Sequence, residues 1–237
     1  MPIIIQISEL GAWDPEGQKV FSDLHFRLHR GEWACITGPP GSGKTLLLSF
    51  IYGEQRPKRG QILVDDRNVM RIHPEKLRQL RRRMGVVSGG MAPLERRTLE
   101  GYMNFKLRAL DLLHEEARIK ALDVLELVGL GNQVGCHTHE ISEADQQLFR
   151  LGLAISHDPV LLLIDDPLQG LPPAGVERFV TVLEQVQMRR RMSILMTTRE
   201  APWADRFHVN VYVLEGGSLR ALHPAAITDS DSGIETS

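Results

Sequence analysis

The sequence predicts an α/β protein in which helices cover both faces of a mostly parallel β-sheet. Three observations support this fold class. Short apolar segments alternate with longer segments of helical periodicity along most of the chain. The apolar segments are continuous rather than alternating, as in parallel strands that are buried on both faces. A glycine-rich turn also joins one of these strands to the helix that follows it.

Length and composition place the chain among soluble globular proteins. Its 237 residues suffice for one large α/β domain with a smaller helical insertion. Hydrophobic residues make up 42% and charged residues 24%, which are ordinary values for a soluble protein. The formal net charge of -2 excludes the strong positive charge of a typical nucleic-acid binder, so we expect no nucleic-acid partner.

The cysteine count and the apolar runs predict a cytoplasmic location. Cys35 and Cys136 are the only cysteines, so the chain has no disulfide framework and suits a reducing compartment. No apolar run approaches the roughly 20 residues that a membrane-spanning helix needs. The N-terminus lacks the basic segment and long apolar core of a signal peptide. We therefore expect any membrane contact to be made through a partner.

In the N-terminal half, apolar segments and turn residues predict a set of strands that includes an antiparallel β-subdomain. The basic helix is opened by a proline, which favours the first helical position. The expected elements are strands at 3–7 and 24–28 around a turn-rich stretch at 11–18, a strand at 33–37, a helix at 44–52, a strand at 61–64, the basic helix from Pro74 to about Arg83, and a strand at 84–87.

The C-terminal half predicts a helical insertion and then further alternation of strands and helices. Residues 99–128 are helix-periodic without a buried strand, and we place the insertion at about 90–157 within one domain of residues 1–222. Ser142 is expected to cap a helix that runs to about His157. The remaining elements are a strand at 160–164, a helix at 174–188, strands at 193–197 and 209–214, and a disordered polar tail at 223–237.

The turn after the strand at 33–37 matches the phosphate-binding pattern G-x-x-x-x-G-K-[ST]. Its glycines allow backbone N–H groups to point inward at phosphate oxygens, and the helix that follows adds its positive end. The lysine supplies a charge to the β- and γ-phosphates, and the threonine hydroxyl is a ligand for Mg²⁺. The expected ATP-binding residues are Gly38, Pro39, Pro40, Gly41, Ser42, Gly43, Lys44 and Thr45.

The second half of the expected site is an apolar strand that ends in two acids. Leu161 to Ile164 leads directly into Asp165 and Asp166. A strand of this kind delivers a carboxylate to the carboxyl edge of the sheet, beside the phosphate-binding loop. We therefore expect Asp165, together with Thr45, to hold Mg²⁺, in a P-loop NTPase fold.

From this point the chain resembles ABC transporter ATPases. The resemblance rests on the order strand, P-loop, helical insertion, and then ISEADQQLFRLGLAISHDPVLLLIDDP, and it covers about residues 3–222. Within the family, GEWACITGPPGSGKTLLL, QRPKRGQILVDD and LRRRMGVV look most similar to the FtsE-like and lipoprotein-export branch. The resemblance implies a head-to-tail dimer with itself or a paralogous ATPase, in which each ATP lies between one P-loop and the other subunit's signature motif. It also implies an FtsX-like or related permease as partner, and a peripheral position on the inner face of the membrane.

The chain departs from the family at several motif positions. The signature glycines, which allow close backbone approach to the partner's γ-phosphate, are absent. The resemblance places Asp166 where the family has its catalytic glutamate, so Asp166 is the expected catalytic residue and hydrolysis is expected to be slow. The departures are Glu143 and Ala144 for the signature glycines, Gly89 for a glutamine, Pro172 for an aspartate, Arg199 for the switch histidine, and Leu46 for a second hydroxyl.

Trp13 lies near the position of the family's adenine-stacking aromatic, offset by about one residue. Stacking needs only a flat ring face, so Trp13 is a candidate adenine contact. The alternative is a partly buried loop tryptophan.

Two other clusters have simpler explanations. The spacing in Cys136-His-Thr-His-Glu140 is too tight for a tetrahedral zinc site, which favours a solvated loop. The arginines of the basic helix form either a solvated face or a contact with anionic lipid or an acidic partner. These arginines are Arg78, Arg81, Arg82 and Arg83.

The sequence leaves two main functional hypotheses. The first is an ATP-binding subunit that dimerises and drives or gates a permease, with weak hydrolysis. The second is a non-hydrolysing interaction subunit that bound ATP stabilises. A small-molecule kinase is disfavoured, because the insertion after Leu99 lacks an arginine-rich phosphate lid.

Overall fold

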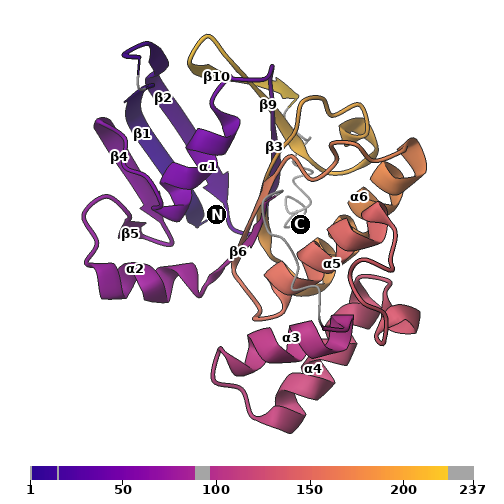
Figure 1. The fold of residues 1–237 in the computed structure, drawn as a ribbon. Helices are drawn as coiled ribbons and strands as arrows, with labels where there is room; N and C mark the ends of the chain where they lie inside the picture. The colour runs from indigo at the N-terminus through magenta and orange to yellow at the C-terminus, as the bar shows by residue number, and fades with distance from the viewer. Residues whose placement is uncertain (1, 15, 89–96, 224–237) are drawn as a thin grey trace, which may run out of the picture.

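A computed structural model describes the chain except for residues 1, 15, 89–96 and 224–237. Figure 1 shows how its elements are arranged. They are β1 (Ile3–Trp13), β2 (Lys19–His29), β3 (Trp33–Thr37), α1 (Lys44–Tyr52), β4 (Arg59–Val64), β5 (Arg67–Asn68), α2 (Pro74–Arg81), β6 (Met84–Val87), α3 (Leu99–Arg108), α4 (His114–Leu127), η1 (Gly131–Gln133), α5 (Glu143–Ile155), β7 (Leu161–Asp165), α6 (Pro173–Arg190), β8 (Ser193–Thr197), η2 (Ala204–Arg206), β9 (Asn210–Glu215) and β10 (Ser218–His223).

The described strands form two sheets, and the predicted fold class is confirmed. The larger sheet has the order β10-β9-β3-β8-β7-β6. Its strands from β9 to β6 are parallel, and β10 pairs antiparallel with β9 at the edge. The smaller sheet has the order β2-β1-β4-β5 and is antiparallel throughout. It lies on the same side of the large sheet as α1, while α5 and α6 lie on the other side (Figure 1).

Each face of the large sheet has its own core, because successive side chains of a strand point to opposite faces. In β3, Ala34 and Ile36 pack with α1 and the small sheet, whereas Trp33 and Cys35 pack with the helices on the other side. Leu161 and Leu163 of β7 likewise face the first core, and Leu162 and Ile164 face the second. This burial on both faces explains why the sequences of these strands are continuously apolar.

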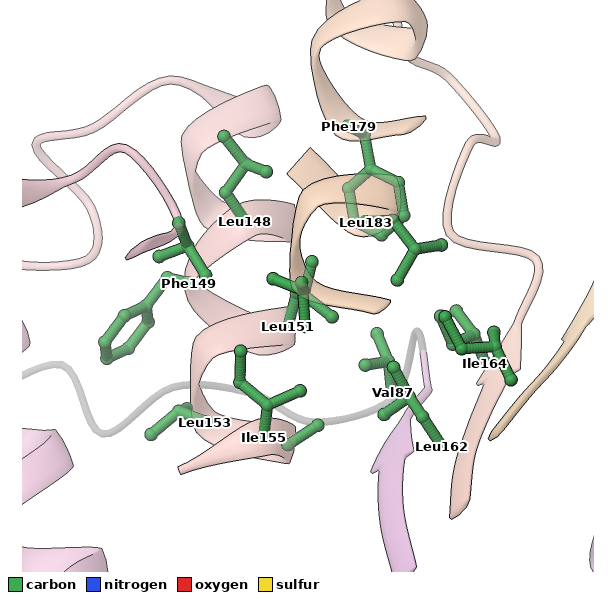
Figure 2. Close-up of a cluster of buried hydrophobic side chains, with 14 of the residues drawn as sticks. Val87, Leu148, Phe149, Leu151, Leu153, Ile155, Leu162, Ile164, Phe179 and Leu183 are labelled. Carbon is green, nitrogen blue, oxygen red and sulfur yellow. The ribbon is translucent and has the colours of Figure 1, made fainter. Parts of the chain in front are cut away.

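The second core joins α5 and α6 to the sheet. Figure 2 shows Leu151 and Ile155 of α5 close to Val87 and Leu162 of the strands, with the α6 side chains alongside. These residues are almost fully buried, and the same cluster includes α3 and α4. The helix that follows the signature-like segment therefore packs directly on the sheet that carries the candidate site.

The helix-periodic segment at 99–128 is helical, but it does not form one continuous helix. The structure has two helices, α3 and α4, which a short turn separates. Asp111 adopts a left-handed φ of 73°, and the N–H groups of Asp111 and Leu112 donate to the carbonyls of Arg108 and Leu107. This pattern is a helix-ending Schellman motif, in which aspartate takes the place that glycine usually fills. Because the residue is not glycine, the sequence carries only a weak signal for the break.

Several predicted boundaries also need correction. Residues 11–13, placed in the turn-rich stretch, belong to β1, where Gly11 pairs with both Ser22 and Arg59. The basic helix ends at Arg81 and α5 at Ile155, each two residues before its predicted end. The short strand β5 was not predicted.

The edge strand β10 was also missed, and it changes one domain boundary. Gly216 and Gly217 both have positive φ (56° and 77°), as a two-residue hairpin turn requires. His223, placed in the polar tail, ends β10, and the rest of that predicted tail lies outside the described residues. In the part of the chain that the structure describes, no helix combines the length and the apolar character needed to cross a bilayer.

Candidate functional site

The candidate site is a cavity of about 370 Å³ at the carboxyl edge of the large sheet. Parallel strands β7 and β8 end there side by side, with Asp165 opposite Thr197 in the strand register. Strand β3 ends at the same edge and continues into the glycine-rich loop and α1. The residues that line the cavity are Val20, Pro40, Gly41, Gly43, Lys44, Thr45, Leu46, Asp165, Asp166 and Arg199.

Glycine is required where the loop enters and leaves its turn. Gly38 has φ 153°, and a Cβ atom there would lie 2.4 Å from the backbone oxygen of Leu214. Gly43 has φ 99°, and a Cβ atom there would lie 2.8 Å from both the Phe21 ring and the Val20 side chain. The loop is therefore held tightly between β2 and β9, in a backbone conformation that side chains disfavour.

The loop presents free backbone donors. In the described part of the chain, the N–H groups of Gly41, Gly43, Lys44 and Thr45 donate no hydrogen bond to another protein group. Ser42 is different, because its N–H donates to the carbonyl oxygen of Pro39 at 3.2 Å. Successive free donors at the start of a helix form a concave site for an anion.

Lys44 lies at the centre of this loop with only 9% of its surface exposed. Its Nζ donates to the carbonyl oxygens of Gly38 at 2.6 Å and Pro39 at 2.9 Å. Burial lowers the pKa of Lys44, the nearby Asp166 and Asp165 carboxylates raise it, and Arg199 lowers it further. The ammonium is thus held against the loop, on the wall of a cavity that also contains two carboxylates.

Asp165 is positioned by the neighbouring strand. The Thr197 hydroxyl donates to Asp165 Oδ1 at 2.7 Å. Thr197 also anchors the next residue, because the Asp166 N–H donates to the Thr197 carbonyl oxygen at 3.0 Å. Thr197 is fully buried, so it holds both acids without facing the cavity itself.

Asp166 and Arg199 form an ion pair across the cavity, with 3.6 Å between Asp166 Oδ2 and Arg199 Nε. Asp166 has a left-handed φ of 43°, which turns the chain sharply after β7. Burial raises the pKa of Asp166, Arg199 and Lys44 lower it, and Asp165 raises it. The two residues that the sequence resemblance places at catalytic positions therefore contact each other.

Other residues selected from the sequence lie elsewhere. Trp13 ends β1 and does not line the cavity; the Lys58 Nζ lies 5.6 Å from the centre of its ring. Pro172 is the residue immediately before the first residue of α6. Gly89 lies outside the described residues.

The signature-like segment forms the first turn of α5, away from the cavity. The Ser142 hydroxyl accepts from the Asp145 N–H at 3.1 Å and donates to Asp145 Oδ2 at 2.7 Å. Asp145 also accepts from Arg178 of α6 at 2.5 Å. Burial raises the pKa of Asp145, but the Ser142 and Arg178 hydrogen bonds lower it more, so the net shift is downward. Ser142 therefore acts as the predicted helix cap, and Glu143 is exposed beside it.

The donor set fits magnesium and a triphosphate. Thr45 and Asp165 bring a hydroxyl and a carboxylate to the same cavity, and hard oxygens are the ligands that Mg²⁺ prefers. The free loop amides and Lys44 face the same space and match an anion. Among the described residues, no three His, Cys, Asp or Glu side chains gather as a separate metal site.

Sequence reasoning did not identify Thr197, Val20 or Arg199 as residues of the site. Arg199 was noted only as a departure from the family motif. Thr197 ends an apolar strand, but its contact with Asp165 requires knowing that β8 lies beside β7. Val20 comes from β2, in the other sheet, and no local pattern connects it to the loop.

Comparison with known proteins identifies a family match. The model of the family described as "ABC transporter" matches residues 21–169, more than half of the chain. The methionine import ATP-binding protein MetN of Thermobifida fusca is 31% identical over 86% of this chain, and the match spans 64% of that relative's length. The phosphonates import ATP-binding protein PhnC 2 of Halalkalibacterium halodurans is 26% identical over 92% of each chain. The cell division ATP-binding protein FtsE of Bacillus subtilis is 25% identical over 91% of this chain and 94% of its own.

Solved structures agree with the fold. The cbiO1 protein of Clostridium perfringens, part of the ABC transporter complex cbiONQ, has a TM-score of 0.84 at 22% identity, covering 93% of this chain and 88% of that one. A dimeric structure of the ATP-binding cassette MJ0796, bound to ADP and Pi, has a TM-score of 0.78 at 20% identity, covering 92% of this chain and 99% of that one. The relatives include import and cell-division proteins at similar identity, so FtsE is one of several similar branches.

Proposed function

This chain belongs to the ABC transporter family, and from that premise we propose that it is the ATP-binding subunit of a transport or cell-division complex. The observation that supports this proposal best is the placement of Lys44, the free loop amides and Asp165 around one cavity. The proposed subunit binds Mg·ATP, dimerises, and drives or gates a membrane permease.

Each part of the cavity has a role in the proposed binding. The free amides of Gly41, Gly43, Lys44 and Thr45 and the Lys44 ammonium receive the phosphate oxygens. Thr45 and Asp165 hold the magnesium ion, which neutralises phosphate charge when it is bound. Trp13 stacks on the adenine, as its position near the family's aromatic suggests.

Hydrolysis by this subunit is proposed to be slow. Asp166 is the catalytic residue of the proposal, but its side chain is one methylene shorter than glutamate and pairs with Arg199. Removing one preorganised polar group costs about 10²–10³ in rate, and a misplaced general base costs about 10²–10⁴. Such losses are not additive. We expect ATP binding to be less affected, because it depends on Lys44 and the loop amides.

The proposed partner is an integral membrane permease, FtsX-like or related, on the inner face of the cell membrane. The names of the relatives support this, since they describe import and cell-division proteins. The chain spans 64% of the length of the MetN relative that it matches.

The proposed dimer partner is a paralogous ATPase with an intact signature rather than a second copy of this chain. Glu143 would place negative charge beside a phosphate held at the α5 N-terminus. The Ser142 hydroxyl is already engaged with Asp145. In a homodimer both sites would carry these defects, so we expect a homodimer to have little activity.

A non-hydrolysing subunit, stabilised by bound ATP, remains the second candidate. The ion pair between Asp166 and Arg199 favours it, because the pair occupies the side chain that would activate water. Asp166→Glu combined with Arg199→His should raise hydrolysis at least severalfold if the subunit is an ATPase. If the Asp166→Asn variant hydrolyses ATP at the same rate as wild type, the assignment of Asp166 as the catalytic residue is wrong.

The binding proposal is tested by titrating the purified chain with a fluorescent ATP analogue and magnesium. Wild type should bind, and Lys44→Ala should abolish binding because the central cation is lost. Lys76→Ala is the matched control, since Lys76 is exposed on α2 and outside the cavity. Equal binding by all three proteins would overturn the proposal.

A further inference from the structure

A second cavity, separate from the candidate site, lies between β5 and α2. Strand β5 is at the edge of the small sheet, and α2 lies next to it (Figure 1). The cavity has a volume of about 500 Å³, and its lining shares no residue with the candidate site. We call it the α2 pocket. Its polar lining residues are Arg67, Asn68, Arg71, His73, Lys76 and Gln79.

The α2 pocket gathers positive charge that nothing in the described part of the chain neutralises. Arg67, Arg71 and Lys76 make no ion pair with a described residue. No aspartate or glutamate is among the described residues that line the pocket. Like charges around one space repel each other, and an anion between them relieves this repulsion. The pocket is therefore electrostatically suited to a negatively charged ligand.

The other basic residues between positions 67 and 83 differ, because each has a partner outside the pocket. They are Arg78, which lies 4.0 Å from Glu75, Arg81, which donates to the carbonyl oxygens of Tyr52 and Gly53, Arg82, which lies 3.6 Å from Asp111, and Arg83, which lies 2.7 Å from Asp65. The neighbouring acids Asp65 and Glu75 are thus engaged elsewhere. Asp66 is exposed in the turn before β5 and does not line the pocket.

The backbone holds the walls of the pocket in place. The carbonyl oxygen of Asn68 accepts from the N–H groups of Arg71 at 3.2 Å and Ile72 at 3.0 Å. Asn68 Oδ1 accepts from the Met70 N–H at 3.0 Å, so its amide nitrogen remains as a donor. On the opposite wall, α2 is anchored by Leu80, which is fully buried. The cations therefore extend from an ordered turn and an anchored helix.

We propose that the α2 pocket binds a phosphate group carried by an organic molecule. Two guanidinium groups and an ammonium suit a phosphate monoester, which has three acceptor oxygens and a charge of about -1.5 to -2 at pH 7. The pocket is larger than one phosphate group requires, so space remains for the organic part. Its source is either a soluble phosphorylated molecule or the headgroup of an anionic lipid.

The lining of the α2 pocket also distinguishes its ligand from Mg·ATP. Magnesium is held by hard oxygen ligands such as carboxylates, and none is among the described residues of this pocket. The pocket therefore suits a metal-free phosphate. The inference does not depend on the proposed function, because the two cavities share no residue.

The test compares two probes that both carry a phosphate monoester. Glycerol 3-phosphate is titrated by calorimetry, and phosphatidylcholine vesicles with and without phosphatidic acid are followed by flotation. At physiological ionic strength, charges separated by more than about 8 Å are largely screened, so remote arginines contribute little. Arg67→Ala combined with Arg71→Ala should weaken binding of at least one probe by about tenfold or more, because two charge-assisted contacts are lost.

Two controls make the result specific. Arg189→Ala combined with Arg220→Ala removes the same charge from two exposed arginines, in α6 and β10, that do not line the pocket. Binding should stay within about twofold of wild type. Lys44→Ala is needed because the glycine-rich loop also attracts phosphate, and it too should change binding by less than about twofold. Circular dichroism confirms that each variant is folded.

The outcomes identify the source of the ligand or overturn the proposal. Glycerol 3-phosphate binding that the Arg67–Arg71 double variant loses assigns the pocket to a soluble phosphorylated molecule. Binding to phosphatidic acid vesicles alone, lost in the same variant, assigns it to a lipid headgroup. The proposal is wrong if wild type binds neither probe, if the Arg189–Arg220 control loses as much binding, or if only Lys44→Ala loses it.

Discussion

At the scale of single residues, the backbone of Gly43 limits which side chains the loop tolerates. Gly43→Ala should destabilise the protein by about 2–3 kcal/mol, because it combines a left-handed φ with contacts that are too short. Its Cβ would lie 2.8 Å from Phe21 and Val20. The measurement is the free energy of unfolding in urea.

Gly41 provides the matched comparison for this prediction. It also has positive φ, 79°, but a Cβ atom there would meet nothing within 4 Å. Gly41→Ala should therefore cost only about 1 kcal/mol, from backbone strain alone. Equal losses for the two variants would show that contact with β2 does not constrain the loop.

A second residue-scale prediction concerns Lys106 of α3, whose Nζ donates to the carbonyl oxygen of Leu153 in α5. Burial lowers its pKa from 10.5 to about 8. Between these values the unfolded chain binds a proton that the folded chain has released, so the free energy of unfolding rises with pH. Below pH 8 both states are protonated and the contribution is constant.

Lys106→Met tests this by removing the titrating group. The difference in unfolding free energy between wild type and Lys106→Met should shift in favour of wild type as the pH rises from about 8 towards 10.5. The neighbouring His157 also has a pKa lowered by burial and by Lys106, but both proteins keep this histidine. A difference that stays constant with pH would refute the assignment.

At the scale of elements, the link between α5 and α6 depends on a partly buried carboxylate. Asp145 receives hydrogen bonds from Ser142 and from Arg178 of α6. Arg178→Ala should destabilise the protein by about 1 kcal/mol, since Asp145 loses a charged partner and Arg178 itself is partly exposed. Arg206→Ala, which breaks a more exposed pair with Glu177, should cost about 0.5 kcal/mol or less. The free energy of unfolding in urea is measured for both variants. A larger loss for Arg178→Ala than for Arg206→Ala indicates that Arg178 links α5 to α6, and equal small losses indicate that it makes only a solvated contact.

The elements also show what the sequence reveals and what it does not. Strand β3, the loop and α1 were predicted with correct bounds, because the glycine pattern, the apolar run and the helix are contiguous. Likewise, Asp165 lies at the cavity because a parallel strand delivers its last residue to the carboxyl edge of the sheet. The turn at Asp111 was not predicted, because an aspartate rather than a glycine adopts the left-handed conformation there.

Contacts between distant segments could not be predicted. The order of strands puts β8 beside β7, and only this order brings Thr197 to Asp165 and Arg199 to Asp166. Nothing in the local sequence at 197–199 indicates these partners. The same holds for Val20, which reaches the cavity because the small sheet lies over the loop.

At the scale of the whole molecule, the cavity and the signature-like segment lie on different elements. The cavity lies at the ends of β3 and β7, whereas the signature-like segment lies at the start of α5. The proposed function therefore requires a second subunit to complete the site. Restoring the signature with Glu143→Gly and Ala144→Gly should increase ATP-dependent dimerisation of this chain, measured by analytical ultracentrifugation. If ATP induces dimers equally well in wild type, the altered signature does not govern pairing.

The most direct test of the central claim is calorimetric titration of the folded wild-type chain with ATP and magnesium. The Lys44 loop, the free amides and Asp165 predict saturable binding of about one nucleotide per chain, lost in Lys44→Ala and weakened when magnesium is removed. A folded chain that releases no binding heat and does not compete for a fluorescent ATP analogue would contradict it.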